Sequence, residues 1–337
     1  MRPALKIFLP LLTSVLLQGC LVHEWPDAPE TRDIHLILSY DTDMDTSEHS
    51  FGTRSQSVIT DNDIRYIIRA FPKVKGSKAS MEPACEFVFS SDAGNGYDNE
   101  FSISVPPGDY DILVWTDMVN DNSTEDLHYS TADFNSISLN GDIHPANTDS
   151  RDAFRGTGGI SVSSDIMDKA PDTLRIEMER PLAKYEFIAD DLAEFIDRQT
   201  AAVLEKNGEI ESSPIRLSDY KVVFHYVGFM PDTYSLFTDK PVDSSTGISF
   251  ESSITKISES EASMGFDYVF INSQSSTVTV QIGIYGPDGG RIGMTEQIEV
   301  PLNRSSHTVM RGGFLLSNAS GGISVNPEFD GDHNLIL

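Results

Sequence analysis

Carboxylates are the most abundant side chains in this sequence that could take part in catalysis or bind a metal ion. The 337 residues include 52 Asp and Glu against 24 Lys and Arg, a formal net charge of −28. A pair of carboxylates could hydrolyse a glycoside, but so many acids do not single out one pair. No G-x-S-x-G elbow, H-E-x-x-H pair, P-loop or dinucleotide fingerprint occurs, and the eight histidines lack metal-ligand spacing. We therefore expect a protein that is not an enzyme and that carries no cofactor.

Two acidic segments could supply oxygen ligands to calcium. Asp41, Asp43 and Asp45 place carboxylates at alternate positions, and Asp117 and Asp121 belong to a second acidic stretch. Calcium takes six to eight oxygens, and an EF-hand loop also needs a glycine at position six and a glutamate at position twelve. The first segment has neither. Solvated acidic loops are the favoured interpretation, with calcium binding as the weaker alternative.

The negative net charge also indicates which binding partners are expected. A strongly anionic protein is repelled by phosphate backbones, so a nucleic-acid partner is not expected. Disorder is the competing explanation of high net charge, but a hydrophobic content of 39% is sufficient to form packed cores.

The first twenty residues look like an export signal. Arg2 and Lys6 precede an apolar stretch over residues 7–17, which is too short to span a bilayer. Leu17-Gln18-Gly19-Cys20 then resembles the lipobox of bacterial lipoproteins. That resemblance implies cleavage after Gly19 and acylation of Cys20 with palmitate-type chains, which would anchor the protein in the outer membrane. An ordinary secretory signal with a chance cysteine is the alternative, and the leaflet is left open.

The other cysteine, Cys85, then has no partner for an intrachain disulfide. Its neighbours Glu86-Phe87-Val88-Phe89 have the texture of a strand, so a buried structural thiol is expected.

Alternating apolar residues predict a chain of short strands with a single helix. Asp190-Asp191 can cap a helix over residues 190–207, and Asn207-Gly208 ends it. Pro106-Pro107-Gly108-Asp109 has the residues of a tight turn and predicts a hairpin between its flanking strands. The expected strands are 34–40, 64–71, 86–89, 101–105, 110–116, 158–162, 173–178, 182–189, 220–227, 266–271, 277–285, 291–300 and 307–315.

Many short strands separated by turns are typical of β-sandwiches. We expect a mainly β protein of two tandem sandwiches, with one crossover helix near 190–207. The expected organisation is a signal peptide (1–19), a lipidated tether (20–32), an N-terminal domain (33–170) and a C-terminal domain (171–337).

Several short motifs resemble the fimbrillin-like lipoproteins of Bacteroidales, most closely their minor-subunit and anchor branch. They are Tyr40-Asp41 after an opening strand, the strand at 64–71, Pro107-Gly108-Asp109-Tyr110, and Arg180-Pro181-Leu182-Ala183-Lys184, similar to an R-x-x-A-K segment of that superfamily. The resemblance implies transthyretin-like sandwiches and a fimbrial structural, anchor or adhesin-like role.

The resemblance also implies how subunits would join. A strand donated by a neighbouring subunit would complete a sheet edge by β-augmentation. In polymerising members an arginine-directed protease releases the first strand, and here Arg32 and Arg54 are candidate sites, although either could be a plain surface arginine. Anchor-type members keep that strand.

A lipid-anchored glycan-binding protein of a nutrient-uptake system is the alternative function. Trp25, Tyr97, Trp115 and Tyr129 could stack on sugars, although Trp115 lies in an apolar strand and is expected in the core. An exposed aromatic platform would favour this alternative, and a sheet groove filled by a terminal strand would favour assembly.

Overall fold

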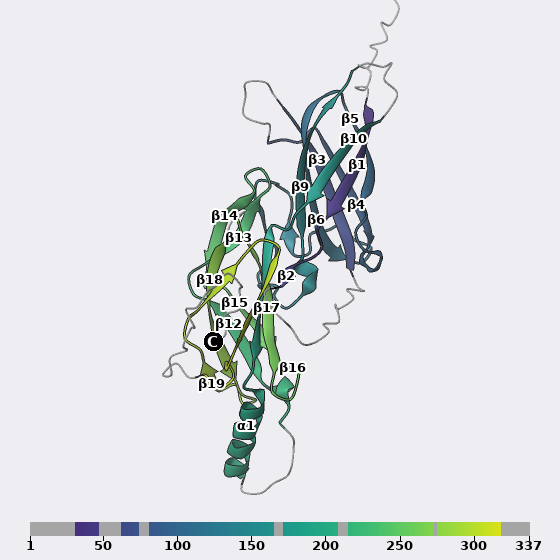
Figure 1. Ribbon diagram of the computed structural model, residues 1–337. Coiled ribbons are helices and arrows are strands. Elements are labelled where there is room, and N and C mark those ends of the chain that lie inside the picture. Colours follow the sequence, from purple (N-terminus) through teal and green to yellow (C-terminus); the bar gives the residue numbers. More distant parts are fainter. Residues whose placement is uncertain are drawn as a thin grey trace, which may run out of the picture.

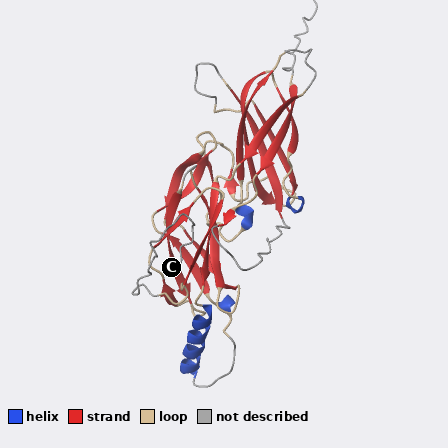
Figure 2. Cartoon of the chain, viewed as in Figure 1, coloured by secondary structure: helices blue, strands red, loops and turns tan. Residues whose placement is uncertain are grey.

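The computed structural model describes residues 31–46, 62–73, 81–164, 171–207, 215–272 and 275–317. Strands dominate these ranges and one long helix accompanies them, as Figures 1 and 2 show. The mainly β fold predicted from the sequence is confirmed. In these ranges the helices are too short or too polar to cross a membrane.

The first sandwich faces a three-stranded sheet, in the order β10-β1-β5, against a four-stranded sheet, in the order β4-β3-β6-β9. Alternate residues of both sheets point inward and form one apolar core. The strands are β1 (Arg32–Tyr40), β3 (Asn62–Pro72), β4 (Cys85–Asp92), β5 (Glu100–Val105), β6 (Gly108–Asn120), β9 (Phe154–Val162) and β10 (Asp172–Met178). A short 3-10 turn, η1 (Ala93–Asn95), follows β4.

The predicted hairpin at Pro106–Gly108 is wrong. The turn is present, but β5 pairs with β1 in one sheet, whereas β6 pairs with β3 and β9 in the other. The chain therefore crosses from one layer of the sandwich to the other at this turn. Turn residues specify a reversal of direction, and they do not specify which sheet receives the next strand.

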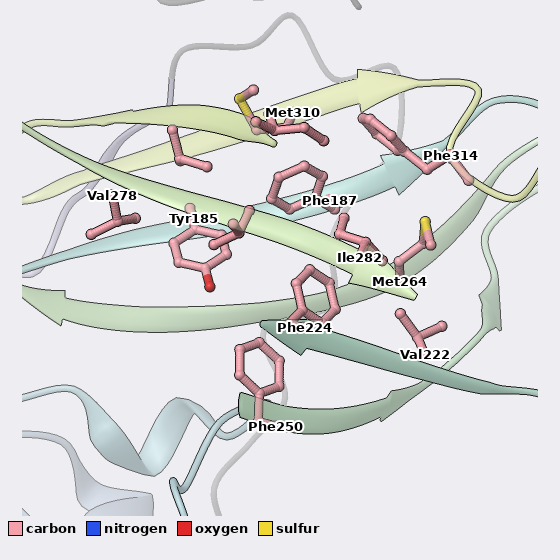
Figure 3. Close-up of a cluster of buried hydrophobic side chains, with 14 of the residues drawn as sticks. Tyr185, Phe187, Val222, Phe224, Phe250, Met264, Val278, Ile282, Met310 and Phe314 are labelled. Carbon is pink, nitrogen blue, oxygen red and sulfur yellow. The ribbon is translucent and has the colours of Figure 1, made fainter. Parts of the chain in front are cut away.

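The second sandwich faces a sheet in the order β16-β17-β11-β21-β2 against one in the order β15-β12-β18-β19, with β20 also paired to β18. Aromatic and aliphatic side chains from both sheets meet between the layers, including Phe187, Phe224 and Phe314 (Figure 3). The strands are β2 (Asp45–Thr46), β11 (Leu182–Ala189), β12 (Lys221–Tyr226), β15 (Ser249–Ser253), β16 (Thr255–Lys256), β17 (Ala262–Phe270), β18 (Ser276–Tyr285), β19 (Arg291–Met294), β20 (Ile298–Leu302) and β21 (Ser306–Gly312).

The helix α1 (Leu192–Asn207) is confirmed near its predicted position, and it connects β11 in one sheet to the 3-10 turn η3 (Leu217–Asp219) and β12 in the other. It projects from the end of the second sandwich that lies away from the first (Figure 1). Only its first turns are buried, through Leu192 and Phe195. The carboxylate of Asp191 accepts hydrogen bonds from the N–H groups of Leu315 and Leu316, so it holds the segment after β21.

A small third sheet joins the two halves of the chain. Its order is β14-β13-β8-β7, formed by β7 (Tyr129–Ser130), β8 (Ile137–Leu139), β13 (Phe229–Ser235) and β14 (Lys240–Thr246). Behind it lies a buried cluster with side chains from both sandwiches, among them Trp115, Tyr129, Tyr234 and Phe270. The junction therefore has an apolar core of its own.

Several further features differ from the sequence expectation. The strand β10, expected in the C-terminal half, pairs in parallel with β1 in the first sandwich. The single strand expected at 291–300 is two strands, β19 and β20. Strands β13 and β14 were not expected, and neither were β2, β7, β8, β15 and β16, because these strands are short or largely polar in sequence.

Candidate functional site

The strand β1 occupies the middle of its sheet. Residues 34–40 pair in parallel with β10, and residues 32–37 pair antiparallel with β5. The N–H of Leu38 also donates to the carbonyl of Asn99. If β1 were absent, β5 and β10 would each expose an unpaired edge, and such edges bind added strands.

The inward side chains of β1 seal the first core. Ile34, Leu36 and Leu38 are at most 1% exposed. Full burial of each side chain contributes roughly 1.5–3 kcal/mol, so the strand is bound tightly by apolar packing as well as by main-chain hydrogen bonds. The groove that holds β1 is therefore a site shaped for an extended segment with alternating apolar residues.

The carboxyl end of β1 is packed among aromatic rings. Tyr40, its last residue, stacks on Tyr97 at a centroid distance of 4.6 Å and meets the edge of Phe154 at 5.3 Å. Its hydroxyl lies 3.0 Å from the Thr116 hydroxyl. Burial raises the pKa of Tyr40 far above its ordinary value, so this hydroxyl stays neutral.

Arg180 holds the residues that follow β1. Its guanidinium donates to the carbonyl oxygens of Asp41, Thr42 and Asp43 at 3.2, 2.8 and 3.0 Å. The same group makes a two-point ion pair with Asp152, in which Nε donates to Oδ1 at 2.8 Å and Nη2 donates to Oδ2 at 2.9 Å. A segment distant in sequence is thereby fixed at the junction.

The short strand β2 carries this segment onto the second sandwich. Asp45 and Thr46 pair in parallel with Ser306 and His307 of β21. Residues 32–46 therefore contribute one strand to each sandwich, with the Arg180 contact between them.

A turn at the junction collects three ion pairs. The turn is the 3-10 turn η2 (Asp149–Arg151), and Asp152 follows it. Three of these residues form ion pairs with charged side chains from the second half of the chain. Asp149 pairs with Lys184, Arg151 with Asp267, and Asp152 with Arg180. The two basic residues of the R-x-x-A-K segment, Arg180 and Lys184, thus both form ion pairs with this region.

Asp267 is the centre of a buried polar network. Its carboxylate accepts from Arg151 and from the hydroxyl of Tyr226, and it lies 2.5 Å from His144 Nε2. Burial alone would raise the pKa of Asp267, but Arg151 and His144 hold that pKa below its ordinary value. Burial also raises the pKa of Tyr226 well above normal. Because Asp267 is fully buried, this network stabilises the junction and offers no access to a substrate.

The residues expected to carry processing fall in different places. Gly19, Cys20 and Arg54 lie outside the described residues. Arg32 begins β1, where it is opposite Val105 of β5.

The first group of calcium candidates does not converge. Asp41 and Asp43 are exposed, and their main-chain carbonyls face Arg180. Asp45 begins β2. Arg180 therefore uses the main-chain carbonyls of Asp41 and Asp43. Nowhere in the described ranges do three His, Cys, Asp or Glu residues come together in a metal-binding group.

The second group is divided between the core and a turn. The buried Asp117 carboxylate receives two hydrogen bonds from Arg65, at 2.9 and 2.7 Å. Asp121 accepts from Asn122 in an exposed turn. The structure does not bring Asp117 and Asp121 together around one point.

The aromatic candidates for sugar stacking are mostly internal. Trp115 and Tyr129 are 0% exposed, and Tyr97 is stacked on Tyr40. The core position expected for Trp115 is confirmed. Trp25 lies outside the described residues. Trp115 and Tyr129 therefore offer no open face for a sugar ring, and one face of the half-buried Tyr97 is covered by Tyr40.

Sequence reasoning missed the role of Arg180. The motif that contains it was visible, but its contacts with residues 41–43 lie about 138 residues away along the chain. One feature of the sequence could have pointed to Arg180. It is a charged residue directly before Pro181 and the apolar strand at 182–189, which is buried.

Comparison with protein families places the chain in a family of unknown function, DUF6562, whose model matches residues 29–336. The chain belongs to this family. A search of curated proteins finds no match.

Several solved structures from Bacteroidales resemble this chain. A candidate adhesin from Bacteroides ovatus is 11% identical, with a TM-score of 0.43 over 80% of this chain and 82% of that one. A candidate polysaccharide-binding protein from Bacteroides thetaiotaomicron is 11% identical, with a TM-score of 0.43 over 78% and 79%. The fimbrial anchor protein Mfa2 from Porphyromonas gingivalis is 12% identical, with a TM-score of 0.41 over 79% and 82%.

Proposed function

We propose that this chain is a cell-envelope lipoprotein that acts as a structural or anchor subunit of a surface fimbria, or as an adhesin-like relative of one. The observation that carries the proposal is β1, an N-terminal strand completing the middle of a sheet with its apolar side chains fully buried. A sandwich whose groove is filled by a terminal strand has the geometry of strand donation.

The proposed lipid anchor is at Cys20. Cys20 precedes β1 by 12 residues, which span at most about 40 Å when extended. An acylated Cys20 would hold the first sandwich close to a bilayer. The second sandwich and α1 would then point away from it, because β1 runs from its amino end toward the junction (Figure 1). Such an arrangement supports a membrane partner on one side and protein partners on the other.

The two candidate processing sites would have different consequences. Cleavage after Arg32 would remove the tether and leave almost the whole of β1 in its sheet. Cleavage after Arg54, which follows β1 and β2 in the sequence, would disconnect both strands from the rest of the chain. Mass spectrometry of the mature protein distinguishes these products.

Purification from native outer membranes after chemical crosslinking tests the proposal. We expect ladders that contain other envelope subunits, and an amino-terminal peptide beginning at acylated Cys20. Cys20→Ser should release the protein from the membrane, whereas Cys85→Ser, the matched control, should leave it bound. A monomer that elutes alone or with glycans would contradict the assembly role, and an unmodified Cys20 would contradict the anchor.

A further inference from the structure

Arg180 donates hydrogen bonds to the three residues that directly follow β1. We propose that Arg180 is a clasp that retains β1 in its sheet against displacement by a competing strand. This inference rests on the proposed function and assigns a device that regulates its strand site.

The geometry uses the whole guanidinium. Nη1 donates to the carbonyls of Asp41 and Asp43, Nη2 donates to the carbonyl of Thr42 and to Asp152, and Nε donates to Asp152. Arginine has five N–H donors in a rigid fork, and all five directions are in use. A lysine has three donors on a single atom and cannot reach both the carboxylate and the row of carbonyls.

The clasp is enclosed. The Arg180 side chain is 4% exposed, and its guanidinium carbon lies 4.6 Å from the centre of the Phe154 ring. Phe154 also contacts Tyr40 and Tyr97, so the aromatic packing around the end of β1 and the clasp form one unit. Without the guanidinium, the largely buried Asp152 carboxylate would lose its cation, which is costly, and the three carbonyls would lose the group that holds them to the junction.

The clasp lies where displacement of the strand must finish. An incoming strand competes with β1 for the edges of β5 and β10, and it must free β1 up to Tyr40. The next three residues are held by Arg180, and the two residues of β2 are paired with β21. Arg180 also follows the end of β10 by two residues, so the clasp is continuous with the strand that pairs with β1.

Native-state hydrogen exchange of the full chain, followed by mass spectrometry, tests the proposal. In the wild type we expect the amides of β1 to exchange no faster than those of the central strand β3. Arg180→Gln should raise exchange in β1 by at least about tenfold relative to β3, because charged hydrogen bonds at one end of the strand are lost. Arg180→Lys should recover only part of the protection.

Two further variants separate a local clasp from general stability. Arg151→Gln is the matched control, because Arg151 is 1% exposed, forms an ion pair with Asp267 and lies in neither β1 nor β3. It should change exchange in β1 and β3 equally. If Arg180→Gln fails to fold, Arg180→Gln with Asp152→Asn removes both charges and should show the same selective opening.

Equal exchange of β1 and β3 in the Arg180 variants, or protection fully restored by lysine, would overturn the clasp. The crosslinking experiment that tests the proposed function involves partners and membranes, whereas this experiment involves the chain alone. The two ideas can therefore fail separately.

Discussion

The two long sides of the first sandwich are closed in different ways. On one side β9 and β10 meet so closely that a Cβ added at Gly156 would lie 2.5 Å from Ile176 Cγ2 and Met178 Sδ. Arg155 and Glu179 also exchange two main-chain hydrogen bonds there, each 2.9 Å long. On the other side the inward residues of β4, which include Phe87 and Phe89, are only half-buried.

This difference shows how a sandwich can be rigid on one side and accessible on the other. Glycines without side chains allow the edges of two sheets to meet and exclude water along the closed side. Along β4, bulky aromatic rings pack on the core but keep part of their surface in solvent. Substitutions that enlarge or shorten a side chain on the closed side should lower stability. Similar substitutions along β4 should cost less, because the side chains there are partly exposed to water.

Phe154→Ala should produce the largest effect. Phe154 lies on β9, is fully buried and contacts Tyr40, Tyr97 and Arg180. We expect a loss of about 3–5 kcal/mol in the free energy of unfolding, because a buried ring is replaced by a cavity. Urea denaturation followed by circular dichroism measures it. A loss no greater than that of Phe89→Ala would contradict the contrast between the two sides.

Gly156→Val should be the next in size. The added side chain would force β9 away from β10, and overpacking of this kind costs about 1–3 kcal/mol. The midpoint of urea denaturation gives the value. Val88→Ile, an enlargement at a side chain that is 43% exposed on β4, is the control and should change stability little. Equal losses for both would show that the two sides are alike.

Phe89→Ala should have a smaller effect than Phe154→Ala. The Phe89 ring lies 5.1 Å from that of Phe101 but is partly exposed, so truncation removes less buried surface. We expect a loss of about 1–2 kcal/mol, below the range for fully buried rings. Thermal unfolding compared with the wild type checks this, and a loss above that of Phe154→Ala would reverse the comparison.

The smallest expected effect concerns the rate at which Cys85 is alkylated. Burial raises the pKa of this thiol above its ordinary value of 9.0. The thiolate is the reactive form, so the rate with iodoacetamide should still rise as the pH increases beyond 9.0. Phe87→Ala, which changes the next residue on the same face of β4, should speed the reaction a few-fold, and Cys85→Ser gives the background. A rate that levels off near neutral pH would contradict the partly buried setting.

Local patterns in the sequence predicted most of the elements. The helix after Asp191 and the strand at 182–189 follow from apolar spacing and a stop at Asn207-Gly208, and both are confirmed. The turn at Gly108 was also predicted, but its strands lie in different sheets. Local residues determine the shape of a turn, whereas the pairing of strands depends on the packing of the whole sandwich.

The candidate site was less predictable for the same reason. The apolar alternation in β1 was evident, but its parallel partner β10 begins more than 130 residues later. The contacts of Arg180 with residues 41–43 have no signature in local periodicity. The polar β13 was missed because its pairing with β8 relies on the apolar cluster behind it.

The path of residues 32–46 has a mechanical consequence. The strand β1 points from its amino end toward the junction. Tension between that end and the second sandwich would therefore act parallel to the strand. Its hydrogen bonds to β5 and β10 would then bear load together in shear instead of opening one after another. This pairing is the geometry in which a strand resists a pull along its length.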